Sequence, residues 1–391
     1  MAEQAKGIEL AFAGAANLLK GESVNDQMLE AQATGIVQAL SPVDPHRAAL
    51  ITALESVGGL DRAFLLRHPF APQFVFLAGL CYGSDIGGGG VSLGEALFRC
   101  AGEAAEVSLR PADLPKSMAP GHAALDGRWP ADERRIAARD VHTGAEISLP
   151  QSAFLGPRQP GHAPASLGLG AGLTDQDAAL SATFELIERD AAHRWWYGET
   201  TPMALPLELL DGVTGTLARL RKGSQTLRFS RLFGLRSPLE VPVVAAISTD
   251  PDGRGLAVGL KSAGDWQRAA RGAVMEMLQM ELALHLARER HNTQSDADAV
   301  PLGLAQLHVE RFDAFRATAS VFPLVPVLSG FDSLASHLSS KGMELYMTRV
   351  ARPDTDQGYR VAKASAPGLI PLPGPGHAAP AGTPGHETEL M

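Results

Sequence analysis

The residues with the clearest chemical potential are two pairs of glutamates, Glu103 with Glu106 and Glu185 with Glu188. Residues three apart on a helix share one face, so the two carboxylates of each pair point together. Their sequence neighbours are mostly apolar or small, which predicts partial burial, and a buried carboxylate needs a cation or a hydrogen-bond donor. If the two pairs meet, their oxygens form the kind of site that Mg²⁺ prefers, with phosphate oxygens completing the shell.

A single Glu-x-x-Glu pair is usually a solvated surface pair, so the surrounding frame matters. Each pair follows a residue that can cap a helix and an alanine four positions later: Ser92 and Ala96 for the first pair, Thr174 and Ala178 for the second. The same frame occurs a third time, with glutamine in the last position, at Asp265, Ala269, Glu276 and Gln279. Matched, capped frames favour a shared site over isolated surface pairs.

These frames predict three helices, over 92–109, 174–196 and from 265 past 286. Strands are expected at 74–80, 241–247, 255–260, 344–350 and 359–364, and a hairpin around 141–144 within an otherwise irregular insertion at 110–165. The pattern predicts an α+β fold of mixed sheets with packed helices, in which one strand-and-helix unit is used three times around a common centre. We expect an N-terminal helical segment at 1–65, a main domain at 66–370 and an extended Pro/Gly-rich tail at 371–391.

Composition excludes several classes of protein. The 391 residues are 45% hydrophobic and 20% charged with a net charge of -9, and no stripe of Lys and Arg is present, so a nucleic-acid-binding surface is not expected. The two cysteines, Cys81 and Cys100, form no Cys-x-x-Cys pair. No signal peptide or membrane span is recognisable, and we expect a cytoplasmic protein without membrane contact.

The glycines give weaker signals. Gly168, Gly170 and Gly172 superficially resemble a dinucleotide-binding loop, but the Rossmann fingerprint needs a strand immediately before it, and the residues at 160–164 do not predict one. The sequence contains no Gly-x-x-x-x-Gly-Lys-Ser/Thr motif, which excludes a P-loop. Any ATP must therefore be held in another way.

The segment Ser166-Leu167-Gly168-Leu169-Gly170-Ala171-Gly172, followed by Glu185-Leu186-Ile187-Glu188-Arg189-Asp190-Ala191, resembles the YcaO family. The family pattern is a Ser-Asn-Gly-Leu-Ala-Ala-Gly-like loop and then Glu-Leu-x-Glu-Arg-Asp-Ala. The stretches 89–106, 271–279 and 359–369 are similar to its earlier Glu-x-x-Glu helix, its later Ala-x-x-Glu helix and its closing strand with a Pro-Gly-Leu turn. The resemblance covers roughly residues 70 to 370.

The resemblance implies a YcaO-type fold with a non-P-loop site for ATP and Mg²⁺. It implies that Ser166, Glu185 and Arg189 contact ATP, with Arg271 and Glu276 as further nucleotide-binding candidates. Arg189 and Glu188 are the expected catalytic residues, Arg189 by neutralising charge on the γ-phosphoryl group. The expected metal ligands are Glu103, Glu106, Glu185 and Glu188.

The activity that the resemblance implies is ATP-dependent activation of a peptide backbone amide. In such cyclodehydratases, a Cys, Ser or Thr of a ribosomally made precursor peptide is cyclised to a thiazoline or oxazoline, as in bacteriocin maturation. Two alternatives stay open: thioamide formation with a sulfur-delivery partner, and a non-catalytic scaffold that presents peptide to another enzyme. Retention of the four glutamates and Arg189 argues against the scaffold.

Three features depart from the family pattern: Val107 stands where Arg is common, Leu167 where Asn is common, and Pro371–Pro375 lies 16 residues before Met391 instead of closing the chain. The last of these bears on cyclisation more than on ATP binding. We expect a homodimer and a separate partner protein for substrate recognition, either a leader-peptide-binding E1-like protein or a TfuA-like one. A flavin dehydrogenase in the same complex is a further expected partner.

Overall fold

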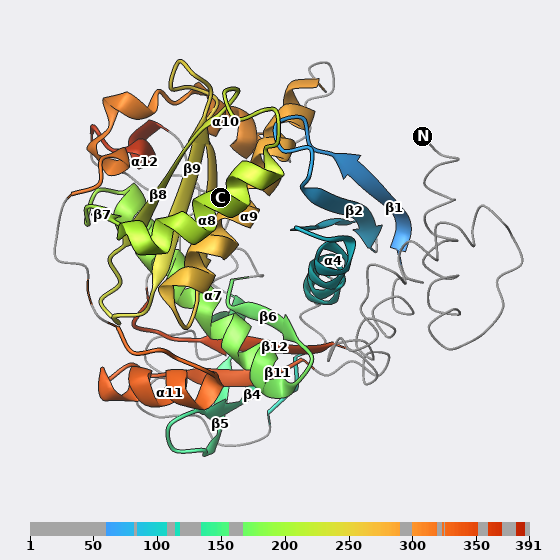
Figure 1. Ribbon diagram of the computed structural model, residues 1–391. Helices are drawn as coiled ribbons and strands as arrows, with labels where there is room; N and C mark the ends of the chain where they lie inside the picture. Colours follow the sequence, from blue (N-terminus) through green and yellow to red (C-terminus); the bar gives the residue numbers. More distant parts are fainter. Residues whose placement is uncertain are drawn as a thin grey trace, which may run out of the picture.

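The computed structural model describes residues 60–81, 84–107, 114–117, 134–155, 167–289, 299–318, 323, 325–350, 359–369 and 381–387. Figure 1 shows these residues as a mixed assembly of helices and sheets, which confirms the predicted α+β class. Residues 1–59 lie outside the described part. The predicted N-terminal helical segment can therefore be compared only at its end, where β1 begins at Leu60 as a strand and not as a helix.

Three antiparallel sheets form the framework. The first has the order β1-β2-β3, with β1 (Leu60–Arg67), β2 (Val75–Cys81) and β3 (Ser84–Gly90). The second has the order β10-β9-β8-β7, with β7 (Met203–Ala204), β8 (Phe229–Leu235), β9 (Val243–Thr249) and β10 (Ala257–Ser262). The third has the order β5-β4-β11-β12-β6, with β4 (Arg135–Asp140), β5 (Glu146–Pro150), β6 (Leu169–Gly172), β11 (Tyr346–Arg349) and β12 (Arg360–Ser365).

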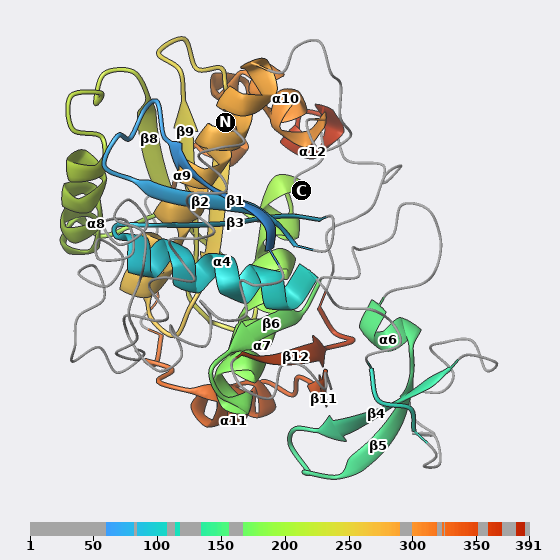
Figure 2. The ribbon, with the colours of Figure 1, turned by 90° about the vertical axis from the view of Figure 1, so that its right-hand side faces the viewer.

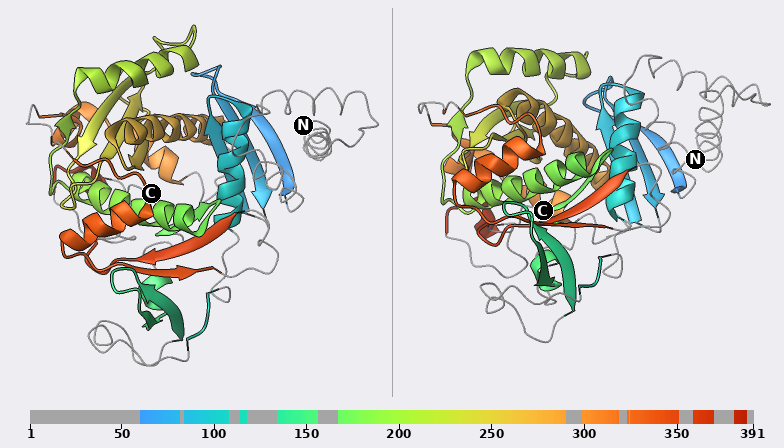
Figure 3. Two further views of the ribbon diagram at one scale, coloured as in Figure 1. Left: turned by 60° about the horizontal axis from the view of Figure 1, so that its bottom comes forward. Right: turned by 90° about the horizontal axis from the view of Figure 1, so that it is seen from below.

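One strand of each sheet leads directly into a long helix. These strand–helix pairs are β3 with α4 (Leu93–Val107), β6 with α7 (Asp175–Trp196) and β10 with α9 (Trp266–Glu289). Figure 3 shows α4, α7 and α9 bordering a common centre, which is the threefold use of one unit that the sequence predicts. The glycine-rich segment at 168–172, which the sequence presents as a loop, is largely the strand β6 itself.

Each of the three helices begins at its predicted cap. The Ser92 hydroxyl accepts a hydrogen bond from the backbone N–H of Glu95 at 3.2 Å. Thr174 Oγ1 accepts one from Asp177 N at 3.0 Å, and Asp265 Oδ1 accepts one from Arg268 N at 2.8 Å. These bonds satisfy N–H groups that lack a partner in the first helical turn, so the spacing from cap to glutamate is set at the start of each helix.

The remaining helices pack around this framework. They are α6 (Ser152–Leu155), α8 (Leu207–Leu220), α10 (Ala299–Gln306), α11 (Phe331–Ser340), α12 (Pro384–Glu387) and the 3₁₀ turns η4 (Val309–Arg311) and η5 (Asp313–Phe315). The prediction of a fully extended tail is wrong at α12, where four residues after Thr383 form one helical turn. This turn begins with proline, which is favoured at the first position of a helix. Figure 2 shows the β4–β5 hairpin, whose turn lies at the predicted position, projecting away from the three long helices. None of the described helices has both the length and the apolar character that crossing a bilayer requires.

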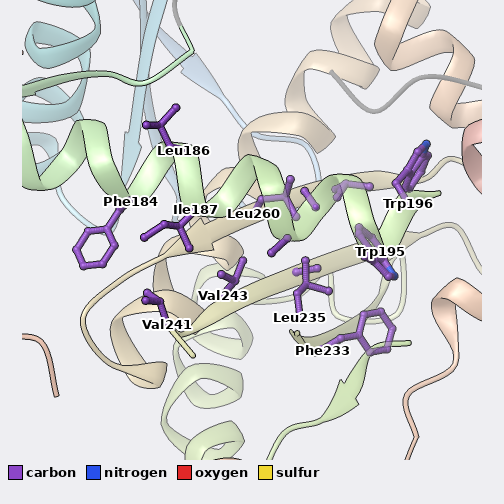
Figure 4. Close-up of a cluster of buried hydrophobic side chains, with 14 of the residues drawn as sticks. Phe184, Leu186, Ile187, Trp195, Trp196, Phe233, Leu235, Val241, Val243 and Leu260 are labelled. Atoms are coloured by element: carbon purple, nitrogen blue, oxygen red, sulfur yellow. The ribbon is translucent and has the colours of Figure 1, made fainter. Parts of the chain in front are cut away.

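The core lies on both faces of the second sheet. Val243, Ala245 and Ile247 of β9 belong to the cluster that includes α7, and Val244 and Ala246 to the cluster that includes α9. Every residue of β9 is buried, because helices cover both of its faces. Figure 4 shows the α7 side of this core, where Ile187 and Trp195 of α7 point toward the labelled residues of β8 and β9.

The two adjacent tryptophans of α7 belong to this core. Trp195 and Trp196 are fully buried and pack edge to face against Phe315. Burial of a large aromatic side chain stabilises a fold by about 2–3 kcal/mol. These residues therefore anchor α7 and are not available to stack a nucleotide base.

A buried ionic network fastens the first sheet to α9. Arg221 and Arg228 both approach Glu281 of α9, and Arg221 also donates to the carbonyl of Phe70 at 3.3 Å. His68 Nε2 lies 2.8 Å from the carbonyl oxygen of Leu278. Burial lowers the pKa of His68 to about 4, so this ring is neutral near pH 7 and the two arginines balance Glu281.

Each strand of the three units approaches its helix through a glycine. A Cβ at Gly88 would overlap the backbone of Ala96, and one at Gly170 would overlap that of Ala178, so both predicted frame alanines lie at the close contact. In the third unit, Gly259 meets Ala273 and not Ala269. In α9 the close contact with the strand therefore lies one turn after the frame alanine, Ala269.

We predict that Gly259→Ala destabilises the protein by about 1–3 kcal/mol, because the added methyl overlaps backbone atoms that cannot move independently. Gly215→Ala is the matched control, since Gly215 is exposed in α8 and has nothing within 4 Å of its would-be Cβ. That change should stabilise by about 0.5–1 kcal/mol. Urea unfolding of both variants measures this, and equal stabilities would contradict the close contact.

Candidate active site

The predicted glutamates of α4 bind two different strands. Glu103 Oε2 accepts a hydrogen bond from Gly87 N of β3 at 2.8 Å, within its own unit. Glu106 Oε1 accepts one from Ala171 N of β6 at 2.7 Å, in the next unit. The pair therefore ties the first strand–helix unit to the second through one helical face.

The glutamates of α7 continue this arrangement. Glu188 Oε2 accepts a hydrogen bond from Ser262 N of β10 at 2.9 Å and so links the second unit to the third. Glu185 Oε1 lies 3.9 Å from Arg189 Nε, one turn along the helix. Arg189 Nη1 is buried, and no residue in the described part of the chain forms a hydrogen bond with it.

The third helix repeats the pattern in a weaker form. Glu276 Oε2 accepts a hydrogen bond from Leu260 N of its own strand β10 at 3.0 Å. Gln279, in the position of Glu106 and Glu188, lies against β3, since a Cβ at Gly89 would be 2.9 Å from its Nε2. The last residue of each frame thus reaches the strand of the following unit, and the three units close a ring.

Burial of these carboxylates shifts their protonation. Desolvation raises the pKa of Glu103 to about 7 against the hydrogen bond from Gly87. Desolvation, and next the charge of Glu185, raise the pKa of Glu106 to about 8. Desolvation and then the charge of Glu188 raise that of Glu276 to about 7. Desolvation also raises the pKa of Glu185, although the charge of Arg189 opposes it.

Cations from three elements face these carboxylates. The charges of Glu188 and Glu185 raise the pKa of Arg189 against its desolvation. Lys261 Nζ of β10 lies 3.7 Å from Glu188 Oε2, and its pKa is raised, first by Glu188 and then by Glu276 and Glu185 against desolvation. Lys363 of β12 is fully buried and donates to the carbonyl of Leu167. Desolvation lowers its pKa to about 8, while the charges of Glu185 and Glu106 act in the opposite direction.

Among the described residues, one predicted site residue, Arg271, is not brought into this centre. Ser166 lies outside the described residues. Arg271 donates to both oxygens of Glu95 at 3.0 and 3.1 Å, and in the described part of the chain its recorded partner is that residue and not one of the paired glutamates. Glu95 also accepts a hydrogen bond from Arg99 at 2.8 Å, so an ionic cluster joins the start of α4 to α9, and the charge of Arg99 also interacts with that of Glu276.

Sequence reasoning missed Lys261 and Lys363, although both carried a signal. Each is the one charged residue inside a strand that is otherwise apolar or small, apart from Arg360 at the very start of β12. A lysine in a strand that must be buried needs a negative partner. The partners, however, come from helices far away in the sequence.

The donor set fits Mg²⁺ and a phosphorylated ligand. All the acidic groups supply carboxylate oxygens, which Mg²⁺ prefers, and the unpartnered Arg189 Nη1 can donate to a phosphate oxygen. Among the described residues, no three acidic, histidine or cysteine side chains lie close enough together to hold a metal ion. The expected four-glutamate cage is therefore not preformed, whereas Mg²⁺ at nucleotide sites commonly takes one or two carboxylates and completes its shell with phosphate and water.

A groove of about 730 Å³ lies elsewhere on the molecule. It is bordered by the first turns of α7, by α11 and by β11 and β12, and its lining includes Arg139, Asp175, Asp332 and Arg349. None of the predicted site residues lines it. The chemical groups with perturbed pKa values thus point to the centre of the three helices as the functional site, and not to this groove.

We predict that Glu106→Gln reduces the loss of stability with rising pH. The folded protein holds the Glu106 proton up to a pKa of about 8, above the ordinary 4.5, so stability from this group is present at low pH and is lost as pH rises through this window. Glutamine cannot ionise. Chemical unfolding at a series of pH values with a metal chelator present should give a flatter profile for the variant. Glu146→Gln, at an exposed position of β5, should follow the wild type, and parallel profiles for Glu106→Gln would contradict the assignment.

The comparisons with known proteins bear on the family and the fold. The family model for the ATP- and Mg²⁺-binding YcaO cyclodehydratases matches residues 93–370. A comparison with curated proteins finds no match.

Among solved structures, YcaO from Methanopyrus kandleri bound with AMPPCP and Mg²⁺ has a TM-score of 0.60 and 18% identity, over 81% of this chain and 87% of that one. A heterocyclase in complex with substrate and cofactor has a TM-score of 0.61 and 17% identity. The match covers 82% of this chain but only 52% of the heterocyclase chain. The E. coli microcin synthetase McbBCD complex contains a chain with a TM-score of 0.55 and 15% identity. The match covers 78% of this chain and 86% of that one. At these identities the likeness shows the fold. Because the family match extends over most of the sequence and includes all three helices of the carboxylate centre, this chain belongs to the YcaO family.

Proposed function

We propose that this protein uses ATP to activate backbone amides of a ribosomally made peptide, cyclising Cys, Ser or Thr to a thiazoline or oxazoline. The observation that carries the proposal is the junction of α4, α7 and α9, where paired glutamates surround an arginine with a buried and unpartnered N–H group. Such a junction fits a phosphoryl group and its metal better than it fits a purely structural role, because unpaired buried donors are rare in folded proteins.

The residues of this centre divide the work as follows. Glu106 and Glu185 would be the chief ligands of the Mg²⁺ that accompanies ATP, Glu188 would border this site, and Glu103 would hold α4 against β3. When bound, the metal neutralises charge on the phosphoryl oxygens. Arg189 donates to the γ-phosphoryl group and stabilises the charge that develops there during transfer.

The reaction removes one oxygen from the peptide. The substrate side chain attacks the preceding amide carbon and loses its proton, and the amide oxygen accepts the γ-phosphoryl group of ATP. Phosphate then leaves as the amide nitrogen loses its proton, which forms the C=N bond of the azoline. An amide oxygen is a poor leaving group until it is phosphorylated, and this is why the reaction needs ATP.

Cyclisation is favoured over thioamide formation because the similar structures include a heterocyclase and a microcin synthetase. The latter is a complex of several proteins, which supports the proposal that a partner protein presents the peptide to this chain. The convergence of the paired glutamates on Arg189 favours a catalytic role over that of a scaffold.

We predict that wild-type protein binds ATP with Mg²⁺ and that Glu185→Gln weakens this binding by at least about tenfold, since a metal-supporting group is lost. Isothermal titration calorimetry measures both affinities. Glu199→Gln is the matched control, because Glu199 also pairs with an arginine near the end of the same helix, Arg194, at 3.2 Å, but lies outside the centre. Absence of ATP binding to the folded wild type, or unchanged affinity in Glu185→Gln, would refute the proposed site.

A further inference from the structure

Lys261 is out of place in its strand. The side chains of β10 are buried at every position except this one, and that of Lys261 is 46% exposed. The neighbouring backbone amides are both used by the carboxylate centre, since Leu260 N donates to Glu276 and Ser262 N donates to Glu188. The strand therefore delivers the Lys261 ammonium group to a point between glutamates of α9 and α7.

A glycine of α9 makes room for the side chain of Lys261. A Cβ at Gly272 of α9 would overlap Cγ of Lys261, so the absence of a side chain at this helical position leaves room for the lysine stem. Nζ then lies 3.7 Å from Glu188 Oε2, and Glu276 and Glu185 also act on it electrostatically. Carboxylates that surround an ammonium group in this way are also the ligands that a divalent cation prefers. Compared with the ammonium group, such a cation carries a second charge and needs more ligands.

We propose that Lys261 takes the place of a metal ion beside Glu188 and Glu276, so that this protein binds one metal ion fewer than it would with a neutral residue at position 261. The ammonium group offsets one negative charge beside Glu188 and Glu276, whether or not nucleotide is bound. It also excludes a divalent ion from this spot by charge. The carboxylates that remain for Mg²⁺ are those on the side of α4, chiefly Glu106 and Glu185. This inference deepens the proposed function, because it concerns the same centre.

Counting bound metal tests the inference directly. Equilibrium dialysis against Mn²⁺ as the probe, followed by metal analysis, gives the number of ions per chain with and without a non-hydrolysable ATP analogue. Lys261→Met should bind one ion more per chain than wild type, because a unit charge some 5 Å from a divalent ion weakens its binding by about tenfold or more even in water. Lys261→Arg should keep the wild-type number.

Two further variants complete the design. Lys341 lies outside the centre, and its Nζ is 2.7 Å from Glu240 Oε2. Lys341→Met should therefore leave the number of bound ions unchanged. Lys261→Gln replaces Lys261→Met if the latter is not folded by circular dichroism. Equal numbers of ions in wild type and the neutral variants, or fewer ions in the variants, would overturn the proposal. The arm without nucleotide keeps the two questions apart: a wild type that binds no nucleotide refutes the proposed function, whereas the metal count alone decides the role of Lys261.

Discussion

The structure depends on one constraint, which is that several carboxylates are withdrawn from water at the meeting point of three helices. A buried acceptor left without a partner costs roughly 1–3 kcal/mol, and more when it is charged. Glu106, Glu188 and Glu276 each meet this cost with a hydrogen bond from a strand N–H, and the more exposed Glu103 accepts a similar bond. Two of these bonds cross from one strand–helix unit to the next. The contacts that position the glutamates of the site therefore also fix the three units relative to one another.

Charge balance links this framework to function. The pKa values of Glu103, Glu106 and Glu276 lie at about 7 to 8, so these carboxyl groups are partly protonated near neutral pH when no metal ion is bound. Cations on α7, β10 and β12 partly offset the remaining negative charge. A bound cation would lower these pKa values and release protons. The centre is thus suited to a ligand that brings positive charge together with phosphate oxygens, as a magnesium nucleotide does.

Local signals made the three long helices and their caps predictable, because Ser92, Thr174 and Asp265 act within a few residues of themselves. The pairing of carboxylates followed from helical spacing alone. Tertiary partners did not: the acidic neighbours of Lys261 and Lys363 and the preference of Arg271 for Glu95 depend on which strand faces which helix. The contact of Gly259 with Ala273 in place of Ala269 has the same origin, since repetition in sequence does not specify how far a helix slides along its strand. The strand β6 was missed because its glycines serve close packing against α7, although glycine usually marks a turn.

We propose that α4, α7 and α9 together form a binding site for nucleotide and metal. A crystal structure of the protein with Mg²⁺ and a non-hydrolysable ATP analogue is the decisive measurement. We expect the terminal phosphate next to Arg189 Nη1 and metal density on oxygens of the paired glutamates, with the Lys261 ammonium group still beside Glu188. Nucleotide bound instead in the groove between α11 and β11, or a triphosphate remote from Arg189, would contradict it.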